Sequence, residues 1–116
     1  MQKLVEFYEL NKHKPFQWGE WDCSIVARDW IEFATGKYFK LPKCKTVREY
    51  LKYDIESFLD NSLIKIDKAK TGDIVLFRNN IGLKTIGIKS TTDIILSPAK
   101  YGLVSVNFPL IRAWSV

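Results

Sequence analysis

The chain has 116 residues, of which 47% are hydrophobic and 14% are aromatic. This length allows one domain with a single core, and the composition excludes a disordered tail or a low-complexity linker. Eighteen basic residues against thirteen acidic residues give a formal net charge of +5, and most of the basic residues are lysines. Because arginine makes most bidentate phosphate and base contacts, a nucleic-acid partner is not expected.

The chain has two cysteines, Cys23 and Cys44, and one histidine, His13. Neither cysteine has a C-x-x-C partner, so no disulfide framework is predicted, although a bridge between the two is left open. No recognised zinc-ligand spacing occurs, and we expect no metal and no cofactor. The first residues lack the apolar core of a signal peptide, and no apolar run approaches the roughly 18 residues that span a bilayer. We therefore expect a soluble domain made inside the cell, with no membrane partner.

Helix signals are concentrated in the first half of the chain. Asp22 is placed to cap a helix, and Gly36 follows that helix as a stop signal. Thr46 and Glu49 have the spacing of a capping box, ahead of a further run of apolar residues at helical spacing. The predicted helices span residues 3–11, 23–34 and 47–59.

After Asn61 the sequence changes to short β-branched segments separated by turn residues, which predict strands. Helices first and strands second is typical of the α+β class, with the N-terminal helices packed on an antiparallel β-sheet or small barrel. We expect a single domain over residues 1–116, with Trp30 and Trp114 in its core. The predicted strands cover residues 63–66, 73–77, 85–89, 93–96, 103–106 and 113–116, with Ser97-Pro98 among the turns.

The lysine-rich segment 36–45 is the most exposed part of the chain by composition. A solvated loop is the simplest interpretation, and a surface for an acidic partner or an anionic glycan is the alternative. Cys44, within this segment, is predicted to be either a packing residue or an exposed thiol.

Residues 16–24 (F-Q-W-G-E-W-D-C-S) place two tryptophans, a glycine and an Asp–Cys pair directly before a helix. Cys23 occupies the first turn of that helix, where unpaired N–H groups and the helix dipole stabilise an anion by about 0.3–1 kcal/mol. This effect predicts a pKa of about 8 for the Cys23 thiol and a partly ionised sulfur at neutral pH. The alternative is that Cys23 is a small buried hydrophobic residue, since cysteine is among the most buried residue types.

Three motifs resemble those of the NlpC-type cell-wall cysteine peptidases. Residues 18–24 (W-G-E-W-D-C-S) resemble the nucleophile motif of that family. Residues 71–77 are similar to its Pro-Gly-Asp-hydrophobic-Phe strand, and residues 85–88 to its His-Val-Gly-Ile strand. Order and spacing match over residues 15–106, and the F-x-W-G-x-x-D-C form together with residues 112–114 (R-A-W) is closest to an uncharacterised, phage-encoded branch. The resemblance implies a compact papain-like fold in which Cys23 stands at the nucleophile position.

The chain departs from the family at two site positions. The general-base histidine of the family corresponds here to Thr85, which cannot take a proton from a thiol near neutral pH. The aromatic residue before the glycine motif is usually a tyrosine, and here it is Phe16, which has no hydroxyl. His13 is the one histidine that remains as a substitute base, and its lysine-flanked position favours a solvated side chain. Since loss of one member of a working triad costs on the order of 10⁴ to 10⁶ in rate, efficient peptidase activity is not expected.

These observations leave three functions open. The first is a phage or prophage virion component, in the tail, neck or adaptor region, built on a degenerate and non-catalytic NlpC-type fold. Such a protein would be made in the host cytoplasm and assembled with other virion proteins, as part of a symmetric ring or assembly. The second is a tail-associated peptidoglycan endopeptidase or amidase, or a thiol transferase, with Cys23 as nucleophile and an unconventional base.

The third is a host-interaction or nucleic-acid-binding module that uses the basic loop. The fold alone requires the retained glycines, the Asp22 cap and a buried cysteine, and it is also compatible with a threonine at position 85. The first function is therefore favoured.

Overall fold

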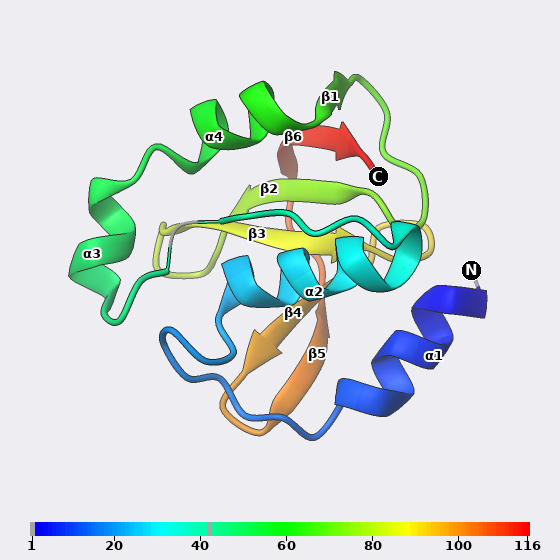
Figure 1. Cartoon of the computed structure of the whole chain (residues 1–116), viewed down its shortest axis with the longest axis horizontal. Helices are drawn as coiled ribbons and strands as arrows, with labels where there is room; N and C mark the ends of the chain where they lie inside the picture. Colours follow the sequence, from blue (N-terminus) through cyan, green and yellow to red (C-terminus); the bar gives the residue numbers. More distant parts are fainter. Residues whose placement is uncertain (1, 42) are drawn as a thin grey trace.

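A computed structural model describes residues 2–41 and 43–116. Within these residues the helices come first and the strands follow, as Figure 1 shows. The strands form one open antiparallel sheet in the order β1-β6-β2-β3-β4-β5. The predicted α+β class is confirmed, with an open sheet rather than a closed barrel. The elements are α1 (Gln2–Asn11), α2 (Cys23–Thr35), α3 (Val47–Lys52), α4 (Ile55–Ser62), β1 (Ile64–Ile66), β2 (Ile74–Arg78), β3 (Lys84–Lys89), β4 (Ile95–Ala99), β5 (Gly102–Val106) and β6 (Leu110–Ser115).

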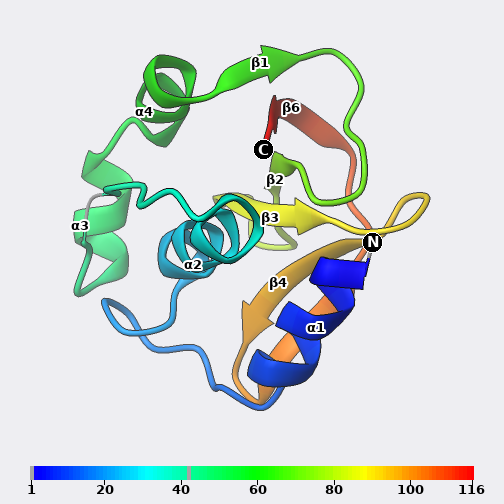
Figure 2. The same ribbon diagram turned by 45° about the vertical axis from the view of Figure 1, so that its right-hand side comes forward.

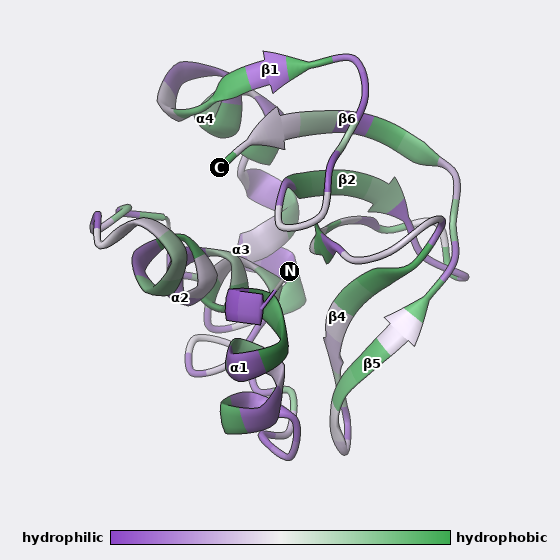
Figure 3. Cartoon of the chain, turned by 90° about the vertical axis from the view of Figure 1, so that its right-hand side faces the viewer, coloured by the Kyte–Doolittle hydropathy of each residue, from purple (hydrophilic) through white to green (hydrophobic). Residues whose placement is uncertain are grey.

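The main core lies between the sheet and the two N-terminal helices. Figure 3 shows α1 and α2 together on one side of the strands. Trp30 of α2 and Trp114 of β6 are buried in this layer, as predicted. The Trp30 indole N–H donates to the carbonyl of Gly72 at 2.7 Å, and the Phe7 ring packs edge-on against Trp30 with centroids 5.5 Å apart. These contacts hold α2 at the centre of the molecule.

The ends of α2 are fixed by the residues that the sequence indicates. Asp22 caps the helix and accepts from the backbone N–H of Ile25 at 3.0 Å. Gly36 closes the helix in the left-handed conformation, with φ of 76°, and donates to the Glu32 carbonyl. Because glycine has no Cβ, it adopts this conformation without steric cost.

The single helix predicted over residues 47–59 is wrong, because the chain forms two helices there, α3 and α4. Tyr53 is extended, with φ of −90° and ψ of 136°, and ends α3. Asp54 then caps α4 by accepting from the Ser57 N–H at 3.1 Å and the Ser57 hydroxyl at 2.8 Å. The apolar spacing continues across this break, so a second cap overrides the periodicity.

The turn predicted at Ser97-Pro98 is also wrong, since both residues belong to β4. Pro98 lies opposite Leu103 of β5, whose N–H donates instead to the carbonyl of Lys12 at 3.0 Å. A proline is tolerated here because this position needs no donor toward β5.

The sheet divides between β3 and β4. These strands pair through Ile88 with Leu96 and Lys89 with Ile95, and then diverge, so that the β4–β5 hairpin turns away from β3 (Figure 2). Gly87 allows this close approach, because a Cβ there would lie 2.5 Å from Ile95 Cγ2. The divergence leaves room for a pocket beside the N-terminus of α2.

Candidate functional site

A pocket of about 390 Å³ brings together three of the four predicted site residues, Phe16, Cys23 and Thr85. Its wall also includes Tyr50 of α3, parts of the turn between β2 and β3 and of the hairpin of β4 and β5, and the aromatic side chains of Trp18, Phe77 and Phe108. Most of these side chains are apolar, which is typical of small-molecule and peptide sites. The fourth predicted residue, Asp22, is buried next to Cys23 and supports the helix end rather than the pocket wall.

The segment before α2 is held as a tight turn. The Trp21 N–H donates to the Gln17 carbonyl at 2.8 Å, and Gly19 has φ of 79°. The Gly19 N–H donates to the Asp22 carboxylate at 2.9 Å, so one buried side chain secures both the turn and the helix. The Phe16 N–H donates to the Ala99 carbonyl at 2.8 Å, which fastens the start of this segment to β4. The Phe16 position is thereby fixed at the pocket.

The Cys23 thiol is almost fully buried, with 4% of the residue exposed. Burial raises its pKa to about 11, and a hydrogen bond from the Ile86 backbone offsets this only in part. The pKa of about 8 that we expected for Cys23 from the helix end is therefore wrong. Removal of a thiolate from water destabilises it by more than the helix dipole stabilises it. Near neutral pH about one thiol in ten thousand is ionised.

Tyr50 is the site residue that the sequence does not reveal. It lies on α3 with 5% of its surface exposed, and its hydroxyl donates to the carbonyl of Lys84 at 2.6 Å. Burial and the neighbouring Cys23 raise the pKa of Tyr50 far above its usual range. A tyrosine on the apolar face of a short helix is typical of a core residue, so no sequence signal marks it.

Neither Thr85, at the position of the family's base, nor His13 is placed to accept a proton from the Cys23 thiol. The Thr85 hydroxyl donates to the Leu83 carbonyl at 3.1 Å. His13 is exposed, and its Cα lies beside Gly102 at the turn between β4 and β5. His13 is not among the described residues that line the pocket, so the structure does not support it as a substitute base.

Cys44 is a packing residue. It is 2% exposed, and burial raises the pKa of its thiol. Both Cys23 and Cys44 are free thiols. Leu41 is also buried and Phe39 packs against the core, so the segment 36–45 is exposed at its lysines but anchored by apolar side chains. The backbone of Cys44 packs against Gly19, where a Cβ would approach the Cys44 carbonyl at 3.3 Å.

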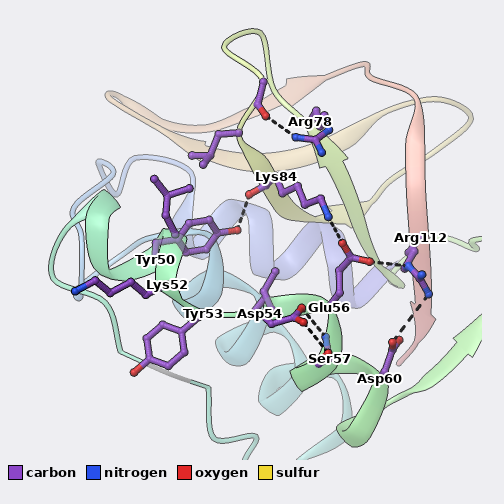
Figure 4. A pocket seen from close by; sticks show the side chains of 14 residues that line it. Tyr50, Lys52, Tyr53, Asp54, Glu56, Ser57, Asp60, Arg78, Lys84 and Arg112 are labelled. Carbon is purple, nitrogen blue, oxygen red and sulfur yellow. Dashed lines mark hydrogen bonds and ion pairs between the residues drawn. The ribbon is translucent and has the colours of Figure 1, made fainter.

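A second, larger pocket of about 640 Å³ lies between α3, α4, the turn of β2 and β3, and β6 (Figure 4). Glu56 of α4 forms ion pairs with Lys84 and with Arg112, the latter at 2.7 Å. Asp60 accepts from the Trp114 indole N–H at 2.9 Å. These contacts fasten α4 to β3 and β6, and Figure 4 shows the Glu56 carboxylate between Lys84 and Arg112. We therefore assign this pocket a structural role.

The described fold and pocket define an α+β domain with a buried cysteine at the N-terminus of its central helix. Its sequence matches, over residues 1–116, the family described as Domain of unknown function (DUF6950), and the chain belongs to that family. No curated protein matches its sequence. Among the described residues, none of the helices has the length and apolar character needed to cross a membrane.

Proposed function

We propose that this protein is a structural component of a phage or prophage virion, in the tail, neck or adaptor region, built on a non-catalytic papain-like domain of the NlpC type. The observation that carries the proposal is the state of Cys23. Its thiol stands at the position that corresponds to the nucleophile of the resembled family, but burial raises its pKa to about 11, and the described residues that line the pocket include no histidine.

Amide cleavage by a cysteine needs a thiolate and an acid that protonates the leaving amine. Ionisation of about one thiol in ten thousand already costs about four orders of magnitude in rate at pH 7. The hydroxyls of Tyr50 and Thr85 donate to the backbone carbonyls of Lys84 and Leu83. Neither hydroxyl is therefore free to protonate a leaving group.

The retained motif residues have folding roles that are independent of chemistry. Asp22 joins the turn at Gly19 to the first turn of α2. Gly87 lets β3 and β4 approach each other. These roles explain why a chain that has lost the base keeps the rest of the pattern, and they support an assembly function for the scaffold.

The test is the protein content of purified particles. Virions purified on a density gradient should contain the chain at a fixed copy number relative to the major tail protein, as a symmetric ring requires. Quantitative mass spectrometry of the particle and of the cleared lysate measures this ratio. Absence from the particles, with all of the chain recovered as a free monomer in the lysate, would overturn the proposal.

One observation favours a second function, a tail-associated peptidoglycan endopeptidase or amidase. Cys23, Phe16 and Thr85 line one pocket, which is the grouping that the resemblance implies for an active site. If this function is correct, the wild-type chain cleaves purified muropeptides, Cys23→Ala abolishes cleavage without unfolding the domain, and Cys44→Ala retains it. We expect no turnover by the wild-type chain.

A further inference from the structure

β5 is the last strand of the sheet, and no strand of the described residues pairs with its outer edge. The Leu103 N–H points outward, toward the Lys12 carbonyl. Because backbone groups alternate along a strand with a period of two, the N–H and C=O of Ser105 point outward as well. Among the described residues, no backbone hydrogen bond outside the strand ladders involves Ser105. The chain thus covers the start of this edge and leaves its second half open.

The open edge carries none of the usual protection against strand pairing. The sequence of β5, G-L-V-S-V, has no charge and no proline, and Val104 is 39% exposed. The opposite edge strand, β1, has three residues and carries Lys65. Natural proteins shorten or charge free edges because unpaired N–H and C=O groups recruit other strands. The contrast between the two edges indicates that β5 is covered in the assembled state.

Pockets lie on both faces of this edge. Val104 and Val106 line the 390 Å³ pocket over Cys23, whereas Ser105 lines a pocket of about 220 Å³ beside Leu4 and Tyr8 of α1. A strand added alongside β5 would direct successive side chains to opposite faces, one set toward each pocket. Both pockets have mostly apolar walls, so apolar side chains fit in both.

The Gly102 end of β5 is basic. Lys100 lies in the turn that leads into Gly102, with its ammonium over the Tyr101 ring at 5.3 Å, and the backbone of Lys12 contacts this end directly. Glu9 pairs with Lys12. Acidic side chains at that end of an added strand would complement this charge. A second copy of the chain, with net charge +5, is a poorer partner than an acidic segment.

We infer that β5 receives an extended segment of another virion protein, which adds to the sheet as a further strand. Its apolar side chains occupy the two flanking pockets, and its acidic residues lie beside Lys100 at the Gly102 end. The inference rests on the proposed assembly function, for which it names the contact.

The experiment uses the full chain and synthetic probes. The probes are two fluorescein-labelled peptides with a central run of valines flanked by threonines, so that apolar side chains face both pockets, and with a pair of aspartates at either the N-terminal or the C-terminal end. We expect saturable binding of at least one of them by fluorescence anisotropy. Replacement of the aspartates by lysines, or of the central residue by proline, should weaken that binding at least tenfold.

Variants at the edge separate strand addition from adhesion to the pocket. Ser105→Pro removes the outward N–H and should weaken binding at least tenfold, whereas Ser105→Ala keeps the N–H and should change it less than twofold. Circular dichroism establishes that each variant is folded. Val104→Lys places a charge on the edge and in the pocket wall, so it tests whether this face is occupied if Ser105→Pro does not fold. In that case the proline-substituted peptide tests strand pairing.

Three results would overturn the inference: no binding of either peptide, equal binding by Ser105→Pro or Val104→Lys, or a dimer of the chain alone that these variants dissociate. The last result would identify a second copy as the occupant. Peptide binding by a chain that is absent from particles would reject the virion function and leave the edge site. Incorporation into particles without peptide binding would reject the edge site alone.

Discussion

The Tyr50 hydroxyl donates to the Lys84 carbonyl at 2.6 Å, and this bond joins α3 to the start of β3 beside Cys23. Tyr50 and Leu83 line both the pocket over Cys23 and the charged pocket next to it, so the pair forms part of the wall between them. A hydroxyl that is bound to a backbone carbonyl is not available to protonate a leaving group. The bond therefore contributes to the fold at a position where a catalytic site would need a proton donor.

Tyr50→Phe should destabilise the domain by about 1–2 kcal/mol, because it leaves the part-buried Lys84 carbonyl without this donor. Urea unfolding followed by circular dichroism measures the change. Tyr53→Phe is the matched control, since Tyr53 is 49% exposed and its loss should cost less than about 0.5 kcal/mol. Equal effects of the two substitutions would mean that the bond to Lys84 is not made in solution.

Alkylation of Cys23 by iodoacetamide should be negligible in the folded protein at neutral pH. The rate should rise only as the pH approaches about 11, since burial raises the pKa of the thiol to that value. In denaturant the same thiol should react with an apparent pKa near its ordinary value of 9.0. A Cys44→Ser background isolates the signal. Rapid labelling of folded protein at pH 7 would contradict the burial of Cys23 and favour the enzymatic alternative.

The same pKa difference makes stability depend on alkaline pH. The folded pKa of Cys23 lies above the unfolded value, so the unfolded chain loses this proton first as the pH rises. The stabilising contribution is complete below pH 9 and disappears progressively toward pH 11. Unfolding free energies measured from pH 7 to pH 11 should therefore fall more steeply for the wild-type chain than for Cys23→Ala. Parallel curves for the two proteins would show that Cys23 does not titrate as described.

Local signals in the sequence predict the elements whose ends have local causes. The ends of α2 follow from Asp22 and Gly36, each within a few residues of the backbone groups that it satisfies. The break between α3 and α4 also has a local signal, since Asp54 and Ser57 have cap spacing, but the continuous apolar pattern obscures it. Pro98 is different, because its place in β4 depends on Lys12, which takes the N–H of the opposite residue.

The candidate site, too, was predictable from the sequence only in part. Motif order alone places Phe16, Cys23 and Thr85 together, and one pocket contains all three. The pKa of Cys23 was not predictable, because it depends on how completely Tyr50 and β3 cover the N-terminus of α2. That coverage is a tertiary contact, and the helix-end effect considered from sequence is the smaller contribution.

Asp22→Ala should cost about 2–3 kcal/mol of unfolding free energy. The substitution removes the cap of α2 and also leaves the Gly19 N–H without its acceptor. Because Asp22 is only 1% exposed, water does not readily replace that acceptor. Asp54→Ala is the comparison, since it removes a cap from an exposed helix end, and its effect should be clearly smaller. Both are measured by urea unfolding. A reversed order would show that the Gly19 turn does not depend on Asp22.

Gly87→Ala should destabilise the domain by about 3 kcal/mol. A Cβ at this position would lie 2.5 Å from Ile95 Cγ2 and 2.9 Å from the Leu96 carbonyl, so β4 must move away from β3. Gly82→Ala is the control, because no atom lies within 4 Å of its Cβ position, although its φ of +81° adds backbone strain of about 1 kcal/mol. Thermal unfolding compares the two. A smaller loss for Gly87→Ala than for Gly82→Ala would contradict the close approach of the strands.

Thr85→His should partly restore an ionised thiol. An imidazolium beside Cys23 favours the thiolate, and we expect the pKa of Cys23 to fall by about 1–3 units, with a roughly 10- to 1000-fold faster alkylation at pH 7. Asn80→His is the matched control, since Asn80 lines the same pocket from its exposed rim, and it should leave the rate nearly unchanged. Because both variants add one histidine to one pocket, a difference between them reports position rather than charge. Equal rates for the two variants would mean that Thr85 does not occupy the position of a base, and the resemblance to NlpC-type peptidases would then not extend to the site.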